Sequence, residues 1–87
     1  MSKEIAYPHL EPRLDSSFMV ARRGDALNGH DRWDIYNAKS HDGLGVIFWY
    51  PAWRQFVFAP EGTPVFSHDC MTALSTFCRF RTQEAKE

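Results

Sequence analysis

The chain has 87 residues, of which 44% are hydrophobic and 15% aromatic, and it carries a formal net charge of -1. This length is enough for one small domain and excludes a second one. Ten Lys and Arg residues against eleven Asp and Glu residues also exclude the broad cationic surface that drives non-specific nucleic-acid binding.

The sequence also bears on cellular location. It contains no apolar run that approaches the roughly 18 to 20 residues of a membrane-spanning helix, and residues 1–5 (MSKEI) lack the apolar segment of a signal peptide. Two cysteines are too few for the disulfide framework of a small secreted protein. We therefore expect a cytoplasmic protein that has no membrane partner.

Residues 1–31 are expected to be the less regular part of the domain, because two prolines, two glycines and scattered charges interrupt them. Their apolar run at residues 17–21 favours a short strand, although five residues do not distinguish a strand from a turn and a half of helix. Residues 24–31 are polar and indicate a flexible loop. The tripeptide at residues 23–25 (RGD) is interpreted as a turn.

Residues 32–66 predict a β-meander. The segment 33–38 is rich in aromatic and β-branched residues and stops before an Asp-Gly dipeptide at residues 42–43, which is typical of a hairpin turn. Segments 44–50 and 55–59 continue the strand pattern on either side of a short connection that begins with proline. The three segments therefore predict three antiparallel strands joined in chain order.

The segment 44–50 is apolar on both of its alternating faces. One face carries Leu44, Val46, Phe48 and Tyr50, and the other carries Gly45, Ile47 and Trp49. A strand of this kind belongs in the middle of a sheet, with one face on the core and the other face covered or used for binding.

Residues 67–82 predict a helix. Ser67 is a suitable N-cap, and Asp69 lies in the first turn, where the helix dipole favours a carboxylate. The apolar residues that recur at helical spacing are Cys70, Met71, Ala73, Leu74, Phe77, Cys78 and Phe80.

This helix is expected to pack on the sheet face that carries Val46, Phe48 and Val57, while residues 82–87 fray as a polar terminus. The predicted fold class is therefore α+β, a three- or four-stranded antiparallel meander with one carboxyl-terminal amphipathic helix on one face. A single helix is too narrow to cover both faces. Aromatic side chains on the other face then need cover from residues 1–31, from a second copy of the chain or from a partner.

Three His-Asp pairs raise the question of a metal site. His68 and Cys70, together with His41, would supply the imidazole and thiolate ligands that zinc prefers. Consecutive residues rarely point at one ion, however, and the sequence has no C-x-x-C or H-x-x-x-H spacing. We therefore favour structural roles for these residues and expect no metal and no cofactor.

The two cysteines, Cys70 and Cys78, lie about 12 Å apart along the expected helix axis and cannot bond to each other. Cys70 as a nucleophile, with His68 or His41 as its base, is chemically allowed. Its place on the apolar stripe favours an ordinary buried thiol instead. Because the sequence also shows no paired carboxylates, phosphate loop or catalytic triad, we do not expect an enzyme.

The most unusual feature of the sequence is a cluster of aromatic residues around one arginine. Its members are Trp49, Tyr50, Trp53, Arg54 and Phe56. This composition matches that of binding hot spots, in which rigid aromatic area and a forked guanidinium contribute most of the energy. The alternative is a small aromatic-rich core. Both interpretations hold together if a strand buries one apolar face and presents the other.

The same region admits single-stranded nucleic-acid binding. Residues 54–58 (RQFVF) faintly resemble the signature strand of the RNA-recognition motif, in which case Tyr50, Phe56 and Phe58 would stack bases. Gln55 replaces the expected glycine, no strand follows the expected helix, and the net charge is near zero. Nucleic acid is therefore the less favoured partner.

Several motifs follow one another along residues 33 to about 80. They are W-x-I-Y-N from Trp33, Leu44-Gly45, W-Y-x-x-W-R-Q-F-x-F-x-P from Trp49, and F-S-x-x-C from Phe66. Their order resembles a group of short proteins encoded by phages, prophages and other mobile elements. The resemblance implies a compact strand-rich domain with a terminal helix and a mobile-element origin, and it carries no established activity or catalytic residue.

Small phage-type proteins often bind and block a host protein, including bacterial defence complexes such as CRISPR effectors. By this analogy, we expect a non-enzymatic protein-binding module that acts in the host cytoplasm as a stoichiometric inhibitor of a host protein or complex, in the manner of an anti-CRISPR protein. Trp49, Tyr50, Trp53 and Arg54 are its expected anchors. A homodimer formed through the sheet face that lacks the helix would also cover the aromatic side chains of that face.

Overall fold

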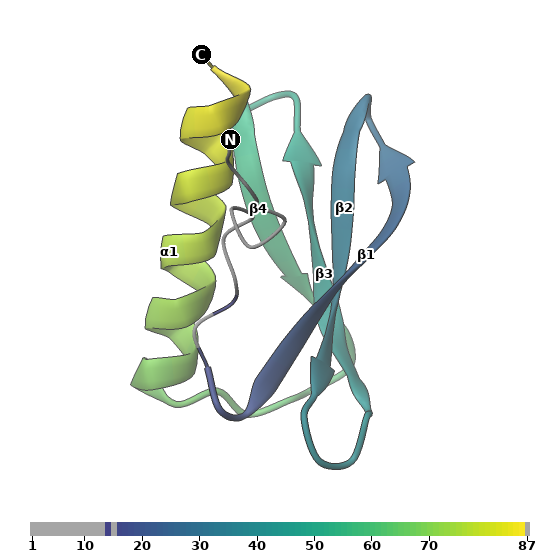
Figure 1. Cartoon of the computed structure of the whole chain (residues 1–87), viewed down its shortest axis with the longest axis vertical. Helices are drawn as coiled ribbons and strands as arrows, with labels where there is room; N and C mark the ends of the chain where they lie inside the picture. Colours follow the sequence, from purple (N-terminus) through teal and green to yellow (C-terminus); the bar gives the residue numbers. More distant parts are fainter. Residues whose placement is uncertain (1–13, 15, 87) are drawn as a thin grey trace, which may run out of the picture.

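The computed structural model describes residue 14 and residues 16–86. The elements, in chain order, are β1 (Met19–Leu27), β2 (His30–Asn37), β3 (Gly43–Tyr50), β4 (Gln55–Pro60) and α1 (His68–Ala85). The strands pair antiparallel in the order β1-β2-β3-β4, and α1 lies along one side of the sheet, in contact with β4 (Figure 1). The predicted α+β meander with one carboxyl-terminal helix is confirmed, with four strands. No helix within the described residues is both long and apolar enough to cross a membrane.

The first strand lies inside the segment that was expected to be less regular. The strand predicted near residues 17–21 is confirmed, but β1 runs on to Leu27. The flexible loop expected at residues 24–31 is wrong, because those residues end β1, turn and begin β2. Asn28 and Gly29 form the turn, with φ angles of 58° and 82°. Asn-Gly is a strong hairpin signal in the sequence.

The tripeptide at residues 23–25 belongs to β1 and is not a turn. The pairing register with β2 shifts between Gly24 and Leu27, which indicates a β-bulge there. A Cβ atom at Gly24 would lie 2.7 Å from Nη2 of Arg32. Glycine at this position therefore leaves room for the guanidinium of the neighbouring strand.

The turn between β2 and β3 also differs from the expected Asp-Gly turn at residues 42–43. Gly43 is the first residue of β3, and the positive φ angle, 66°, belongs to His41. The side chain of Asn37 organises this turn, because its Oδ1 accepts hydrogen bonds from the backbone N–H groups two and three residues later, at 2.9 and 3.0 Å.

The helix begins where the sequence predicts and ends later. Oγ of Ser67 accepts a hydrogen bond from the backbone N–H of Cys70 at 3.2 Å, so the predicted N-cap is confirmed. The fraying expected from residue 82 is wrong, since α1 continues to Ala85; residue 87 lies outside the described residues. Oγ1 of Thr82 accepts a hydrogen bond from the backbone N–H of Phe56 at 2.9 Å, which ties the last turns of α1 to β4.

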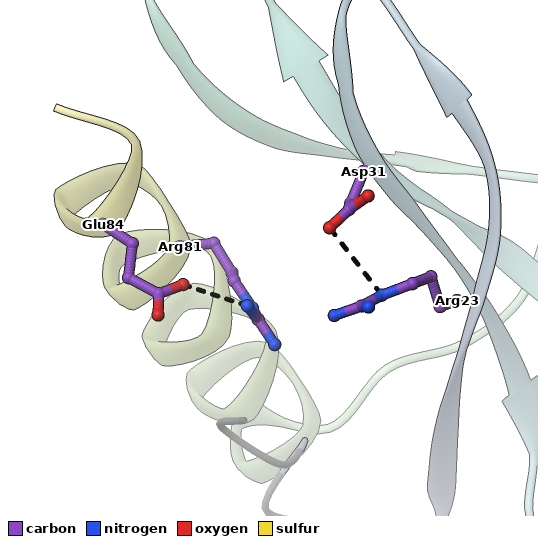
Figure 2. A network of polar contacts seen from close by, with 4 residues as sticks. All are labelled: Arg23, Asp31, Arg81 and Glu84. Carbon is purple, nitrogen blue, oxygen red and sulfur yellow. Dashed lines mark hydrogen bonds and ion pairs between the residues drawn. The ribbon is translucent and has the colours of Figure 1, made fainter. Parts of the chain in front are cut away.

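The buried stripe of α1 differs from the predicted one at its margins. Cys70, Ala73, Leu74 and Phe77 are buried as expected, but Met71 and Phe80 are 55% and 45% exposed. Arg81, only 7% exposed, completes the stripe. Its guanidinium carbon lies 4.4 Å from the centroid of the Trp33 ring, and its Nη1 lies 2.9 Å from Oε1 of Glu84 (Figure 2).

The helix covers the sheet face opposite to the expected one. The buried strand residues are Met19, Trp33, Ile35, Ile47 and Phe56. Trp33 contacts Phe77 of α1, with ring centroids 5.2 Å apart, which identifies this face as the one towards the helix. Val46, Phe48 and Val57 alternate with the buried positions and lie on the other face. The expectation that these three residues hold the helix is therefore wrong.

Candidate binding surface

The five predicted binding residues lie in three different places. Tyr50 lies on the sheet face opposite α1, which we call the outer face, and Trp53 of the β3–β4 turn packs against the Tyr50 ring. Trp49 and Arg54 line a hollow beside the carboxyl end of α1. Phe56 is 7% exposed and lies in the core, so little of its ring is accessible to a partner. Adjacent residues of a strand point to opposite faces, and the cluster therefore does not form one surface.

A row of three rings, from Phe48 through Tyr50 to Trp53, occupies one end of the outer face. Successive ring centroids lie 6.4 and 4.9 Å apart, with interplanar angles of 80° and 71°. These are favourable edge-to-face contacts. Tyr50 is 38% exposed and Trp53 64% exposed. The contact with Tyr50 positions the Trp53 ring while most of that side chain still faces solvent.

A hollow of about 490 Å³ adjoins this row. Val46, Phe48 and Ala59 form its apolar wall, and its charged lining residues are Arg32, Asp34 and Glu61. Nε of Arg32 lies 3.7 Å from Oδ1 of Asp34, and both side chains are partly buried. The outer face therefore combines exposed rings, a concave apolar wall and a few charged side chains, a composition typical of protein interfaces.

A second hollow, of about 700 Å³, lies on the helix side. It is lined by His30, Trp49, Pro51, Arg54, Ala85 and Lys86, and we call it the basic hollow. The rings of His30 and Trp49 stack with centroids 4.3 Å apart and 12° between their planes. His30 and Lys86 could not be assigned to one site from the sequence, because only the fold brings these distant residues together.

The stacking platform predicted for single-stranded nucleic acid does not form. Phe56 is buried, and Phe58 lies on the helix side, where its ring centroid is 5.5 Å from that of Phe66. Tyr50 lies on the outer face instead. The three rings therefore do not share a surface on which successive bases could stack.

The candidate metal and nucleophile residues lie outside both hollows. His68 is exposed at the start of α1, with Nε2 3.3 Å from Oδ1 of Asp69. Within residues 14 and 16–86, no three His, Cys, Asp or Glu side chains are grouped to hold a metal ion. Cys70 is a buried thiol, as expected. Burial raises the pKa of the Cys78 thiol from 9.0 to about 11, so this cysteine stays protonated at neutral pH.

Comparisons with known proteins find no significant match: no protein-family model, no curated protein and no solved structure matches this chain. The resemblance to phage and mobile-element proteins therefore stays a prediction. The fold itself offers two candidate binding surfaces, the outer face and the basic hollow.

Proposed function

We propose that this protein is a non-enzymatic protein-binding module whose partner rests on the outer face. The observation that carries the proposal is the exposed ring of Trp53 in edge contact with Tyr50. Removing a large aromatic side chain from water contributes roughly 1.5 to 3 kcal/mol. Because the Tyr50 contact already positions the Trp53 ring, this side chain loses little conformational entropy when a partner buries it. Tyr50 and Trp53 are therefore the proposed anchors.

The charge of the outer face favours a protein over a nucleic acid as its occupant. Arg32 lies beside Asp34, and the guanidinium carbon of Arg22 lies 5.5 Å from the centroid of the Tyr36 ring. These side chains do not make the continuous cationic track that a phosphate backbone needs. The net charge of -1 points the same way.

The resemblance to phage and mobile-element proteins supports, by analogy, a host protein or complex in the host cytoplasm as the partner. A module of this size would act by steric occlusion at one stoichiometric interface, as an inhibitor of anti-CRISPR type does. Trp49 and Arg54 lie on the helix side and are not part of this proposed contact.

The substitution Trp53→Ser tests the anchor. Because the ring is largely exposed, we expect an unchanged melting temperature, together with at least a tenfold loss of affinity, about 1.4 kcal/mol. Met71→Ser is the matched control, since Met71 is similarly exposed but lies on α1. The partner is captured from bacterial lysate on immobilised wild-type protein, identified by mass spectrometry, purified, and titrated with each variant by calorimetry.

Equal affinities for the wild-type protein and folded Trp53→Ser would remove Trp53 from the interface. Light scattering over a range of protein concentrations tests separately whether the chain forms a dimer. A dimer that dissociates on Trp53→Ser substitution would show that a second copy of the chain, and not a host protein, occupies the outer face.

A further inference from the structure

The basic hollow is independent of the proposed protein contact, because it lies on the other side of the sheet. Its volume of about 700 Å³ falls within the roughly 300 to 1,000 Å³ of small-ligand sites. The β1–β2 turn, the β3–β4 turn and the carboxyl end of α1 all lie at this end of the molecule (Figure 1). We propose that this hollow binds a nucleotide unit, with its base against the stacked rings of His30 and Trp49 and its phosphate on Arg54.

The aromatic part of the hollow is held in place before any ligand binds. Phe56 makes edge contacts with the rings of His30 and Trp49, at centroid distances of 5.9 and 5.3 Å. Nδ2 of Asn28 donates a hydrogen bond to the backbone carbonyl of Trp49 at 2.9 Å, which joins the β1–β2 turn to β3. Stacking on an aromatic side chain favours the binding of a base, and a platform that is already ordered reduces the entropic cost of binding.

The charges of the hollow select an anionic ligand. Arg54 and Lys86 line it, and the described residues that line it include no carboxylate. The carboxyl end of a helix carries a partial negative charge, and Lys86 is the C-cap of α1. This partial charge offsets the attraction of Lys86 for a phosphate, so Arg54 becomes the principal phosphate ligand, through its forked guanidinium.

The backbone at Arg54 supplies an independent argument. Three described residues other than glycine have positive φ angles: Asn28, His41 and Arg54, the last at 53°. Asn and His are enriched in this left-handed region, whereas Arg is not. Such a conformation is strained in a residue with a Cβ atom. An arginine at a position that suits glycine is explained if its side chain is needed for binding.

The test is a titration of ¹⁵N-labelled protein with adenosine monophosphate, followed by NMR. We expect a saturable shift of the indole N–H signal of Trp49, while the signals of Trp33 and Trp53 stay in place. Arg54→Gly should weaken binding at least fivefold and leave the melting temperature equal or higher, since glycine relieves the positive φ angle. A mere loss of fold would lower that temperature. Arg22→Ala, which removes an exposed cation of the outer face, is the matched control and should bind like the wild type.

Parallel titrations define the ligand more closely. Inorganic phosphate should compete only weakly, because it lacks a ring to stack. A six-nucleotide single strand that binds more tightly than the monophosphate would indicate a nucleotide within a strand, and equal affinity would indicate a free nucleotide. Both results support the proposal.

Three results would overturn it: no saturable shift with the monophosphate, equal binding by Arg54→Gly and the wild type, or tighter binding of a Glu-rich peptide than of either nucleotide ligand. None of these results bears on the outer face. Loss of partner binding in Trp53→Ser therefore remains a separate measurement.

Discussion

Arg81 is a charged residue in the core, and its neighbours explain how it is accommodated. Its guanidinium carbon lies over the rings of Trp33 and Phe77, at 4.4 and 5.4 Å from their centroids. Glu84, one turn later, provides the opposite charge, and Arg23 of β1 extends towards the same region beside Asp31 (Figure 2). Ring faces and a carboxylate together offset the loss of hydration that burial of a guanidinium causes. A side chain that looks like a solvated helix residue in the sequence therefore joins the helix to the sheet.

At the scale of single residues, we predict a pH effect from Cys78. Burial holds the pKa of this thiol at about 11 in the folded protein, above its ordinary value of 9.0. The folded state therefore binds the proton more tightly than the unfolded state, and the associated stability is complete below pH 9 and is lost as the pH rises through 11. We expect a loss of about 1 to 2 kcal/mol after allowing for partial exposure.

Urea unfolding of the wild type and of Cys78→Ala at pH 8 and pH 11 measures this effect. The difference in unfolding free energy between the two pH values should be larger for the wild type, because the other titrating groups are common to both proteins. Identical differences in both proteins would contradict the prediction.

At the scale of elements, α1 and β4 are joined by a hydrogen bond as well as by apolar packing. The backbone N–H of Phe56 donates to Oγ1 of Thr82. Because β4 is the last strand in the sheet order, an outward N–H group on it has no further strand to pair with. The hydroxyl of Thr82 supplies the acceptor.

Thr82→Val should remove this acceptor while keeping the shape of the side chain. We expect a loss of about 1 to 2 kcal/mol in the free energy of unfolding, because a partly buried N–H group is left without a partner. Hydrogen exchange at the Phe56 amide should become faster. Thr76→Val, on an exposed position of the same helix, is the control and should change little. Equal effects of both substitutions would show that the hydrogen bond does not contribute.

At the scale of the whole molecule, two layers place different chemistry on the two sides of one sheet. The side towards α1 holds the core and, at its end, the basic hollow. The outer face holds the row of rings that ends at Trp53. Because neighbouring residues of one hairpin supply both sides, a single short segment, residues 49–54, contributes to two separate candidate sites.

Substitutions on the two faces test this layer arrangement. Ile47 is 0% exposed, so Ile47→Thr should lower the free energy of unfolding by about 2 to 4 kcal/mol through lost volume and a buried hydroxyl. Val57 lies on the outer face, and Val57→Thr should cost less than about 1 kcal/mol. Urea unfolding measures both values. A larger loss for Val57→Thr than for Ile47→Thr would show that α1 covers the other face.

Several features of the candidate sites can be predicted from the local sequence pattern, and others cannot. The aromatic cluster and its hairpin were identified from composition. The alternation of a strand already places Trp49 and Tyr50 on opposite faces, so their separation could have been predicted. Asn28-Gly29 could have located the first hairpin in the same way. The partnership of Trp49 with His30 could not, because it depends on the pairing of strands that are distant in sequence.

The sequence by itself determined the α+β class, the three strands of residues 32–66, the start of the helix at Ser67 and the buried thiol of Cys70, because each depends on neighbouring residues along the chain. The tertiary structure decided which sheet face meets α1, how far the helix extends and which rings remain exposed. Both faces of β3 are apolar, so local periodicity does not distinguish them. Which face meets α1 depends on the total packing energy of four strands against one helix, and this energy cannot be read from any single segment.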